Sequence, residues 1–486
     1  MLSISDLEKQ NPWWKDKINI NNDPKIQILE NAIIKWTPEI ITEFDLTKDV
    51  VYSLRGPRQT GKTTLTKIII KKELETKNPN AIFYFSCDLI INDAKELEGI
   101  INTYIDWANK ITTDRKLIII DEISEVKNWE KAIKRIIDQK SNKNKTFILT
   151  GSHSIDIYKS VEKLPGRRGE DTGTFTHKVF YPMSFREYVR LTQPKLYENI
   201  FKLINNKDKE FIQICNGQVP ESLYKLQIYK IELDALLEEY LLTGGFISVI
   251  NNYKKNNKIE NTLYEEYIRS IFGDFAKINK NQKYVFQILS SIIKKETSQV
   301  SWNAITKDTH IKDSRTVENY VELLQGMLIV DTFYPVDKNT KQIKYSLTDK
   351  KIYLNNPFLF HAFRALINGS INYFEESKHY LNTEDKSKLV EFIFGNHLLR
   401  KINKMYPSDL AYINEKVYFF KGKKEIDFVI KLENKLIGFE VKYQNQITKS
   451  DYSPLYILDK GILISKNTFE TEKYNCIPIS LMLMYL

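Results

Sequence analysis

Cysteine and histidine are both scarce in this sequence. Its 486 residues include three cysteines, Cys87, Cys215 and Cys476, and six histidines. These residues are scattered along the chain, so none has the short spacing of a zinc knuckle or of a disulfide-stabilised small domain. The sequence therefore excludes a disulfide framework and predicts no Cys/His zinc site.

Long apolar runs are missing as well. No run approaches the roughly 18 residues that a membrane-spanning helix needs. The first residues, Met1-Leu-Ser-Ile-Ser, lack the basic and apolar regions of a signal peptide. We therefore expect no membrane partner and a cytoplasmic location.

The chain does contain enough apolar residues for several cores. Hydrophobic residues make up 42% and charged residues 28% of the sequence, which is typical of a folded multidomain protein. Lys and Arg outnumber Asp and Glu by 72 to 62, and residues 276–315 alone hold eight basic and three acidic side chains. This local excess of positive charge favours a polyanionic partner.

The clearest motif is a phosphate-binding loop. It follows an apolar run at 50–54, precedes a helix-like run at 65–74, and consists of Gly56, Pro57, Arg58, Gln59, Thr60, Gly61, Lys62, Thr63 and Thr64. In such a loop the backbone N–H groups face the β-phosphate, the Lys62 ammonium reaches the β/γ oxygens, and the Thr63 hydroxyl binds magnesium. The motif predicts that this loop binds a nucleotide.

Two acids end a later apolar run at 117–120. Asp121 can hold Mg²⁺ through water, and Glu122 can polarise the attacking water. The alternative is a strand that simply ends in a solvated acidic turn. Because a phosphoryl-transfer enzyme has little use for a water-polarising carboxylate, the pair favours nucleotide hydrolysis over transfer to a second substrate.

Three further side chains are candidates for contact with the γ-phosphate. Thr150 follows the apolar run at 146–149 and could orient the water, sense the γ-phosphate or cap the next helix. Arg167 and Arg168 could reach the γ-phosphate of their own or a neighbouring subunit, as in a homo-oligomer, or be ordinary surface arginines. Guanine recognition would call for an Asn/Thr-Lys-x-Asp box after a strand of the same sheet. The one match lies far away at 448–451, so the expected nucleotide is ATP, with Mg²⁺.

The alternation of apolar runs and helical segments predicts the fold. Strands at 50–54, 81–85, 117–120 and 146–149, separated by helices, indicate an α/β domain with a parallel sheet covered on both faces. Such sheets bind ligands beyond the carboxyl ends of their strands, where these motifs lie.

The rest of the chain is expected to form three more parts after a core at 1–194. Residues 195–280 read as a helical lid, with a long helix at 221–242. Residues 281–370 read as a winged helix, with helices at 281–295, 301–309 and 314–327, Ser314 as an N-cap, and strands at 328–334 and 342–347. Residues 371–486 read as a smaller α/β unit, with a helix at 387–403 and strands at 426–431, 436–443 and 461–465.

Several motifs together resemble a known family. They are Arg55–Thr64, the Asp121-Glu122 strand, Thr150-Gly-Ser152, Leu164–Arg168, Tyr181–Tyr188 and Tyr240–Phe246. The combination is similar to prokaryotic AAA-type ATPases that carry the domain of unknown function DUF4143, and to the related archaeal ATPase family. The resemblance implies an AAA-like core, a winged helix and a C-terminal restriction-endonuclease-like domain.

The C-terminal part holds a second group of acids. Asp427 lies on one expected strand, and Glu440 and Lys442 lie on one face of the next, because residues i and i+2 of a strand point the same way. Two carboxylates and a lysine can bind Mg²⁺ and activate water against a phosphodiester, and they resemble the PD-(D/E)xK nuclease motif. Glu391 matches the upstream acid of that family. The alternative is a cross-strand ion pair.

The expected winged helix carries the basic cluster. Lys307, Lys312 and Arg315 flank the start of its third helix, so they could contact DNA phosphates while Thr316 and Asn319 face a groove. Winged helices also mediate protein contacts, and lysine-rich faces are often only solvated. The resulting hypothesis is an ATP-hydrolysing AAA-type protein that acts on DNA, with metal-dependent nuclease activity in its last domain. The alternative is a nucleotide-switch regulator with a catalytically inactive nuclease-like scaffold.

Overall fold

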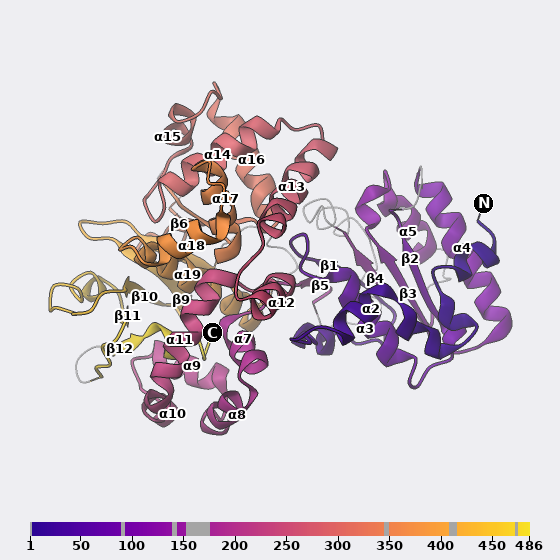
Figure 1. Cartoon of the computed structure of the whole chain (residues 1–486), viewed down its shortest axis with the longest axis horizontal. Coiled ribbons are helices and arrows are strands. Elements are labelled where there is room, and N and C mark those ends of the chain that lie inside the picture. Colours follow the sequence, from indigo (N-terminus) through magenta and orange to yellow (C-terminus); the bar gives the residue numbers. More distant parts are fainter. Residues whose placement is uncertain are drawn as a thin grey trace. The chain divides into compact units, whose positions relative to one another are not determined.

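A computed structural model describes residues 2–88, 93–138, 143–151, 175–344, 349–407, 416–471 and 475–486. The chain divides into two compact units, Met1–Tyr181 and Pro182–Leu486 (Figure 1). The predicted boundaries after residues 194, 280 and 370 do not coincide with this division, and the four-part organisation stays a prediction. Among the described residues, no helix is both long and apolar enough to span a membrane.

The first unit is built on a five-stranded sheet in the order β2-β3-β4-β1-β5. All neighbouring strands are parallel, which confirms the predicted parallel α/β core. The strands are β1 (Val50–Arg55), β2 (Ile82–Ser86), β3 (Lys116–Asp121), β4 (Lys145–Thr150) and β5 (His177–Val179). The first four match the apolar runs of the sequence to within a residue or two, because strands buried on both faces are apolar throughout.

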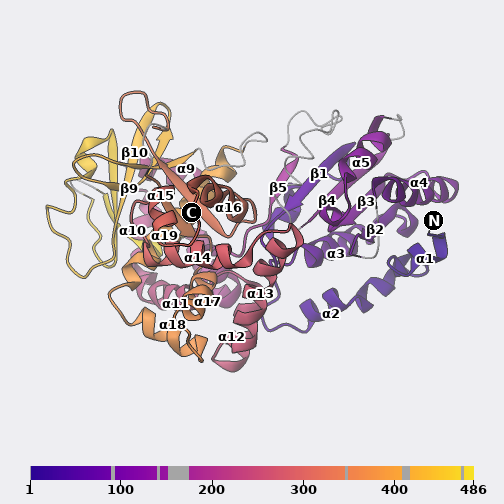
Figure 2. The same ribbon diagram turned by 90° about the horizontal axis from the view of Figure 1, so that it is seen from above.

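Helices cover both faces of this sheet (Figure 2). Helices α4 (Ala94–Ile111) and α5 (Trp129–Asp138) pack on one face, where their apolar side chains join those of β1–β4 in a single core. Helices α2 (Pro24–Glu30) and α3 (Lys62–Glu73) lie on the other face. Helix α3 begins at the P-loop lysine, so the strand–loop–helix context predicted for the motif is present.

The N-terminal segment covers the exposed edge of the sheet at β2. The Asn11 side chain accepts a hydrogen bond from the Tyr84 N–H (2.7 Å) and donates one to the Tyr84 carbonyl (2.9 Å). The indole N–H groups of Trp13 and Trp14 both donate to the Ile82 carbonyl. An uncovered edge strand would expose unpaired backbone groups. These side chains satisfy backbone groups of β2 without adding a strand.

The second unit begins with a helical region, as the sequence predicts for 195–280. Its helices are α7 (Phe185–Thr192), α8 (Pro194–Leu203), α9 (Lys207–Cys215), α10 (Glu221–Leu226), α11 (Lys230–Thr243), α12 (Ile247–Asn256) and α13 (Asn261–Lys277). The expected long helix at 221–242 is instead α10 and α11, separated by a 3₁₀ turn at Gln227–Tyr229. Gly244, which has φ +62°, caps the C-terminus of α11.

Three helices follow at the places predicted for a winged helix. They are α14 (Gln282–Lys294), α15 (Trp302–Lys307) and α16 (Ser314–Gly326). The predicted N-cap is wrong by one residue. Asp313 caps α16, because its carboxylate accepts the Arg315 N–H, and Ser314 is the first helical residue.

A seven-stranded mixed sheet, in the order β12-β11-β10-β9-β8-β6-β7, organises the rest of the unit. The strands are β6 (Val330–Pro335), β7 (Lys351–Leu354), β8 (Val417–Phe420), β9 (Ile426–Leu432), β10 (Lys435–Lys442), β11 (Lys460–Ser465) and β12 (Asn475–Pro478). The remaining helices are α17 (Pro357–Ile367), α18 (Tyr373–Leu381), α19 (Lys386–Met405) and α20 (Ile479–Met482).

The first strand of the expected wing is part of the C-terminal sheet. β6 pairs with β7 on one side and, through Tyr334 and Pro335, with β8 on the other. Because β8 pairs with the second edge of β6, the strands β6 and β7 extend the C-terminal sheet. The second wing strand predicted at 342–347 lies partly outside the described residues. Within them, Ile343 pairs antiparallel with Val336, and the Lys344 N–H donates to the Pro335 carbonyl (2.8 Å).

Candidate nucleotide site and a second carboxylate cluster

The P-loop joins β1 to α3 in a tight turn. Gln59 and Gly61 both have positive φ, 60° and 95°, and a Cβ on Gly56 would lie 2.5 Å from the Phe180 carbonyl oxygen. The backbone therefore needs glycine at position 56 for close approach, and at 61 for its conformation. The Thr60 hydroxyl donates to the Pro57 carbonyl (2.8 Å) and closes the loop from within.

Lys62 lies across this loop. Its ammonium donates to the carbonyls of Gly56 (2.9 Å) and Pro57 (3.1 Å), which places the positive charge over the turn that would hold a phosphate. No side chain caps the N-terminus of α3. The N–H groups of its first turn are thus available to an anion, and the donor set fits a nucleotide phosphate.

The structure brings Asp121, Glu122, Thr63 and Thr150 together at the carboxyl ends of β3 and β4. The Thr63 hydroxyl donates to Asp121 Oδ2 (2.8 Å), and the Thr150 hydroxyl donates to Asp121 Oδ1. Thr150 also accepts the backbone N–H of Glu122 (3.2 Å). Thr150 therefore links the predicted metal-side acid to the predicted base, and its buried hydroxyl has partners on both.

Glu122 adopts a left-handed backbone conformation with φ +52° and ψ +39°. This conformation is strained for a residue that has a Cβ, and residues with strained backbones cluster at functional sites. The turn follows directly on the buried end of β3 and leaves Glu122 half-buried, whereas Asp121 is almost fully buried. The strain thus falls on the residue predicted to act as general base.

Tyr84 is a fourth residue at Asp121 that sequence reasoning missed. It pairs with Ile119 on the neighbouring parallel strand, so it shares a face with Asp121 two residues further on. Its hydroxyl donates to Asp121 Oδ2 (2.9 Å). Lys67 of α3 lies 3.4 Å from the centre of the Tyr84 ring and pairs with Asp23 (3.2 Å). The N-terminal segment is thereby connected to the acid.

The Asp121 carboxylate is well suited to hold a magnesium ion. Every hydrogen bond that the described part of the chain gives it comes from a neutral hydroxyl, and no described lysine or arginine forms an ion pair with it. Its negative charge therefore remains for a cation, and the Thr63 hydroxyl beside it is a second oxygen ligand. The predicted Arg167 and Arg168 lie outside the described residues.

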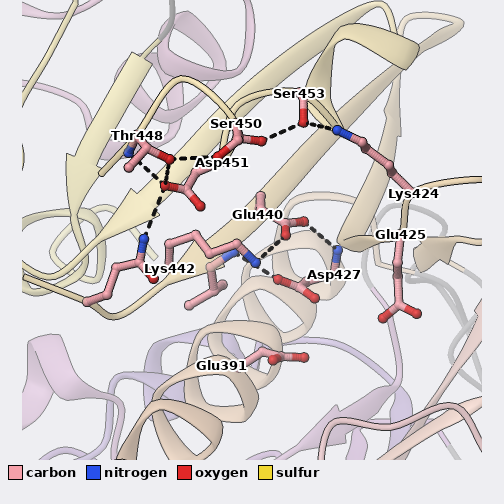
Figure 3. Close-up of polar contacts among 12 residues, drawn as sticks. Glu391, Lys424, Glu425, Asp427, Glu440, Lys442, Thr448, Ser450, Asp451 and Ser453 are labelled. Carbon is pink, nitrogen blue, oxygen red and sulfur yellow. Dashed lines mark hydrogen bonds and ion pairs between the residues drawn. The ribbon is translucent and has the colours of Figure 1, made fainter. Parts of the chain in front are cut away.

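The second carboxylate cluster lies in the C-terminal sheet (Figure 3). Asp427 on β9 and Glu440 on β10 come together next to the pair Phe428–Phe439. The Asp427 N–H donates to Glu440 Oε2 (3.3 Å), the Val441 N–H donates to Asp427 Oδ2 (2.9 Å), and the Lys442 ammonium lies 2.6 Å from Glu440 Oε1. The structure thus unites these three predicted residues.

Glu391 reaches the same cluster from helix α19. Gly395, one turn further along the helix, allows close packing on the sheet, because a Cβ there would lie 2.3 Å from the Phe428 ring. Residues i and i+4 share a helix face, so Glu391 faces the strands at this contact. All four residues predicted for the C-terminal site are therefore neighbours.

Lys351 of β7 lies among these acids and was not predicted. Its ammonium makes ion pairs with Glu391 Oε1 (3.2 Å), Glu425 Oε1 (2.5 Å) and Asp427 Oδ1 (3.0 Å). Its side chain is only 1% exposed. Tyr353, two residues along β7, donates its hydroxyl to Glu391 Oε1 (2.6 Å). The same strand face therefore supplies two donors to one carboxylate.

Burial and like charge shift the ionisation of this cluster. Burial, and then the Asp427 charge, raise the pKa of both Glu391 and Glu440 above the usual range. Burial alone would lower the pKa of Lys351, but Glu391, Asp427 and Glu425 hold it well above its ordinary value. No group of three or more His, Cys, Asp or Glu residues in the described ranges has a metal-binding arrangement.

The basic residues of the expected winged helix lie on the surface. Lys307 ends α15, Lys312 precedes α16, and Arg315 is in the first turn of α16, and all three are exposed. Asn319, one turn further, is exposed as well, and Thr316 is half-buried. The Thr448–Asp451 box forms a surface turn in which Asp451 accepts the Thr448 N–H (2.7 Å; Figure 3).

Comparison with family models separates three segments of the chain. Residues 48–189 match the model of an AAA domain, residues 234–369 a domain of unknown function (DUF8612), and residues 386–482 a domain of unknown function (DUF4143). The first match contains the P-loop, Asp121, Glu122 and Thr150. With the parallel sheet and the site geometry, it supports an AAA-type P-loop ATPase domain in the first unit.

Two relatives come from the archaeon Methanocaldococcus jannaschii. The chain is 24% identical to the uncharacterized protein MJ1637 over 304 residues, which cover 61% of this chain and 59% of that protein. It is also 24% identical to the uncharacterized protein MJ1544 over 426 residues, which cover 84% of this chain and 79% of that protein. The similarity therefore extends well beyond the AAA domain.

Solved structures of similar proteins include the Walker-type ATPase PABY2304 of Pyrococcus abyssi. It is 15% identical with a TM-score of 0.38, and the match covers 74% of this chain and 97% of that one. The Orc1 protein of Aeropyrum pernix, solved in complex with DNA, is 13% identical with a TM-score of 0.30, covering 66% and 86%. Because both TM-scores lie below 0.5, neither structure carries an inference about this chain.

Proposed function

We propose that the protein hydrolyses ATP at the P-loop site and uses the cycle to act on DNA. The observation that carries the first half is the continuous set of contacts from Thr63 through Asp121 and Thr150 to Glu122. It supports one hydrolytic centre in which phosphate, metal and water each have a nearby group of suitable chemistry.

Each residue of this centre has a separate role in the proposal. Lys62 and the N–H groups of the loop bind the β- and γ-phosphates. Bound Mg²⁺ neutralises charge on the phosphate oxygens, and Thr63 and Asp121 would hold it. Glu122 accepts a proton from the attacking water, and Thr150 orients the Glu122 backbone. Arg167 and Arg168 remain candidates for the γ-phosphate, from the same or a neighbouring subunit.

The proposal that DNA is the partner is supported by the exposed cations at the start of α16. Lys307, Lys312 and Arg315 precede or begin a helix whose N-terminal turn also carries Thr316. Among the described residues, no ion pair involves these three side chains, so their charges remain available to phosphates. A partner protein with an acidic surface would use the same charges and is distinguished by the experiment below.

Fluorescence anisotropy with labelled DNA tests this half of the proposal. Replacing Lys307, Lys312 and Arg315 by Gln should weaken binding and reduce the log–log salt slope by about one unit per lost phosphate contact. A matched control replaces the exposed residues Lys110, Lys131 and Lys134 of the first unit by Gln, which removes the same charge. Equal affinity and slope in the wild type and the α16 variant would refute the DNA assignment for this surface.

A measurement of ATP turnover tests the coupling. Turnover is compared without DNA and with single-stranded, duplex and branched DNA. We expect stimulation by at least one form of DNA in the wild type and its loss in the α16 variant, while basal turnover is retained. Slow basal turnover with tight ADP retention and no response to DNA would instead favour the nucleotide-switch alternative.

The C-terminal cluster allows two functional hypotheses. The convergence of Asp427, Glu440, Lys442 and Glu391 supports metal-dependent cleavage of a phosphodiester. The ammonium of Lys351 in their midst supports the alternative, a nuclease-like scaffold without catalysis. The position of this ammonium decides which hypothesis the geometry favours.

A further inference from the structure

The ammonium of Lys351 has three anionic neighbours within the cluster. A lysine has three N–H donors and no acceptor. Here the three nearest anions are Glu391, Glu425 and Asp427, at 3.2, 2.5 and 3.0 Å. The ammonium thus joins helix α19 and strand β9 to its own strand, β7.

The same oxygens would be needed by a metal ion. A magnesium ion shared by the helix acid and the strand acid would bind Glu391 Oε1 and Asp427 Oδ1 at about 2.0–2.1 Å. Both atoms lie within 3.2 Å of the Lys351 Nζ. A metal ion and this ammonium would therefore compete for the space next to these two oxygens.

Lys351 cannot readily move out of the way. Its side chain is 1% exposed, and β7 pairs with β6 through Lys351 itself, opposite Phe333. Moving the ammonium would leave it buried without partners or require its strand to leave the sheet, and breaking a buried ion pair from one side is strongly unfavourable. The remaining acid, Glu440, is already paired with Lys442 (2.6 Å).

We propose that Lys351 is the resident cation of this cluster: its ammonium takes the place that a divalent metal would occupy, and the C-terminal domain of this chain is an ion-paired scaffold. Mg²⁺ therefore does not fit between Glu391 and Asp427 while Lys351 is present. This inference selects the scaffold hypothesis for the C-terminal domain, and it is independent of whether the first unit hydrolyses ATP.

Mn²⁺ titration of the full chain without nucleotide, followed by electron paramagnetic resonance, tests the proposal. We compare the wild type, Lys351→Met, Asp427→Asn and the double variant. The wild type and Asp427→Asn should bind Mn²⁺ alike, because the cluster takes no metal in either. Lys351→Met removes the cation with little change in volume and should gain one saturable site, which the double variant should lose.

Two results would overturn the proposal. One is Mn²⁺ binding by the wild type that disappears in Asp427→Asn, together with Asp427-dependent nicking of supercoiled DNA. The other is a folded Lys351→Met variant that gains no site, because something other than Lys351 would then exclude the metal. If Lys351→Met does not fold, the comparison of the wild type with Asp427→Asn decides alone. ATP turnover, measured in parallel, reports separately on the first unit.

Discussion

Two clusters of carboxylates lie in the described part of the chain, and their acids have different partners. In the first unit, the Asp121 carboxylate accepts hydrogen bonds from the hydroxyls of Thr63, Tyr84 and Thr150. In the second, Asp427 and Glu391 face the ammonium of Lys351. Hydroxyls orient an acid without adding positive charge, whereas the Lys351 ammonium places a positive charge among the acids. In the second cluster an ammonium therefore occupies space beside the acids that the first cluster leaves to a cation.

Equivalent Asp→Asn changes in the two clusters should therefore have different effects. Asp121→Asn removes the charge that would hold Mg²⁺ and should reduce ATP turnover by about 10²–10⁴-fold, since metal ions contribute several kcal/mol to such transition states. Asp427→Asn should leave turnover unchanged and lower the free energy of unfolding of the second unit by up to about 3 kcal/mol, because Lys351 loses one of its partners. Steady-state kinetics and denaturant unfolding of both variants check the pair.

Tyrosine-to-phenylalanine changes sharpen the comparison at a smaller scale. Tyr84→Phe removes a hydroxyl from Asp121 and should raise the Mg²⁺ concentration for half-maximal turnover by up to about 10-fold, as loss of an outer-shell partner does. Tyr353→Phe removes the hydroxyl from Glu391 and should cost only about 1 kcal/mol of stability. An unchanged Mg²⁺ requirement in Tyr84→Phe would show that this hydroxyl does not position the acid.

Glu296 shows what happens to a buried acid without a cation. Its Oε2 accepts a hydrogen bond from the Tyr380 hydroxyl (3.2 Å), and its Oε1 has no hydrogen-bond partner among the described residues. Burial raises the pKa of Glu296 to about 8, which the Tyr380 hydrogen bond and Lys388 only partly offset. The folded protein therefore holds a proton that the unfolded chain, with a pKa near 4.5, releases.

This difference fixes the sign of the pH dependence of stability. Because the folded state binds more protons between about pH 4.5 and 8, stability falls as pH rises through that window, by up to about 1.4 kcal/mol per pH unit. Glu296→Gln cannot ionise and should flatten this decline. Thermal unfolding of the second unit at pH 5, 7 and 9 measures this decline in stability. Parallel curves for the wild type and Glu296→Gln would refute the assignment of the decline to Glu296.

The sequence predicts the first cluster better than the second for a physical reason. The P-loop, Asp121, Glu122 and Thr150 sit at fixed positions after strands that are apolar throughout, so a parallel sheet must bring their ends to one edge. The apolar pattern does not predict the contact of Tyr84 with Asp121, because this contact depends on the register of two parallel strands. The ends of the strands that frame these motifs lie within one residue of the apolar runs that predict them.

The second cluster depends on a pairing that no local pattern encodes. Asp427, Glu440 and Lys442 are adjacent through one hairpin, and their shared face follows from alternation. Lys351 lies on β7, a strand that the sequence analysis did not predict and that joins the sheet through β6. Its one sequence signal is the alternation Lys351-Ile-Tyr353 beside apolar residues, which places a lysine and a tyrosine on one face of a buried strand. That signal does not identify their partner.

The most direct test of the central claim, that the first unit is an ATP-hydrolysing centre, compares nucleotide binding and turnover in three proteins. The wild type should bind ATP and release phosphate in the presence of Mg²⁺. Lys62→Ala should lose nucleotide binding, since it removes the cation at the loop. Glu122→Gln should bind ATP as the wild type does and lose about 10²–10⁴-fold in turnover, the usual contribution of a general base. Hydrolysis by Glu122→Gln at the wild-type rate would contradict the account.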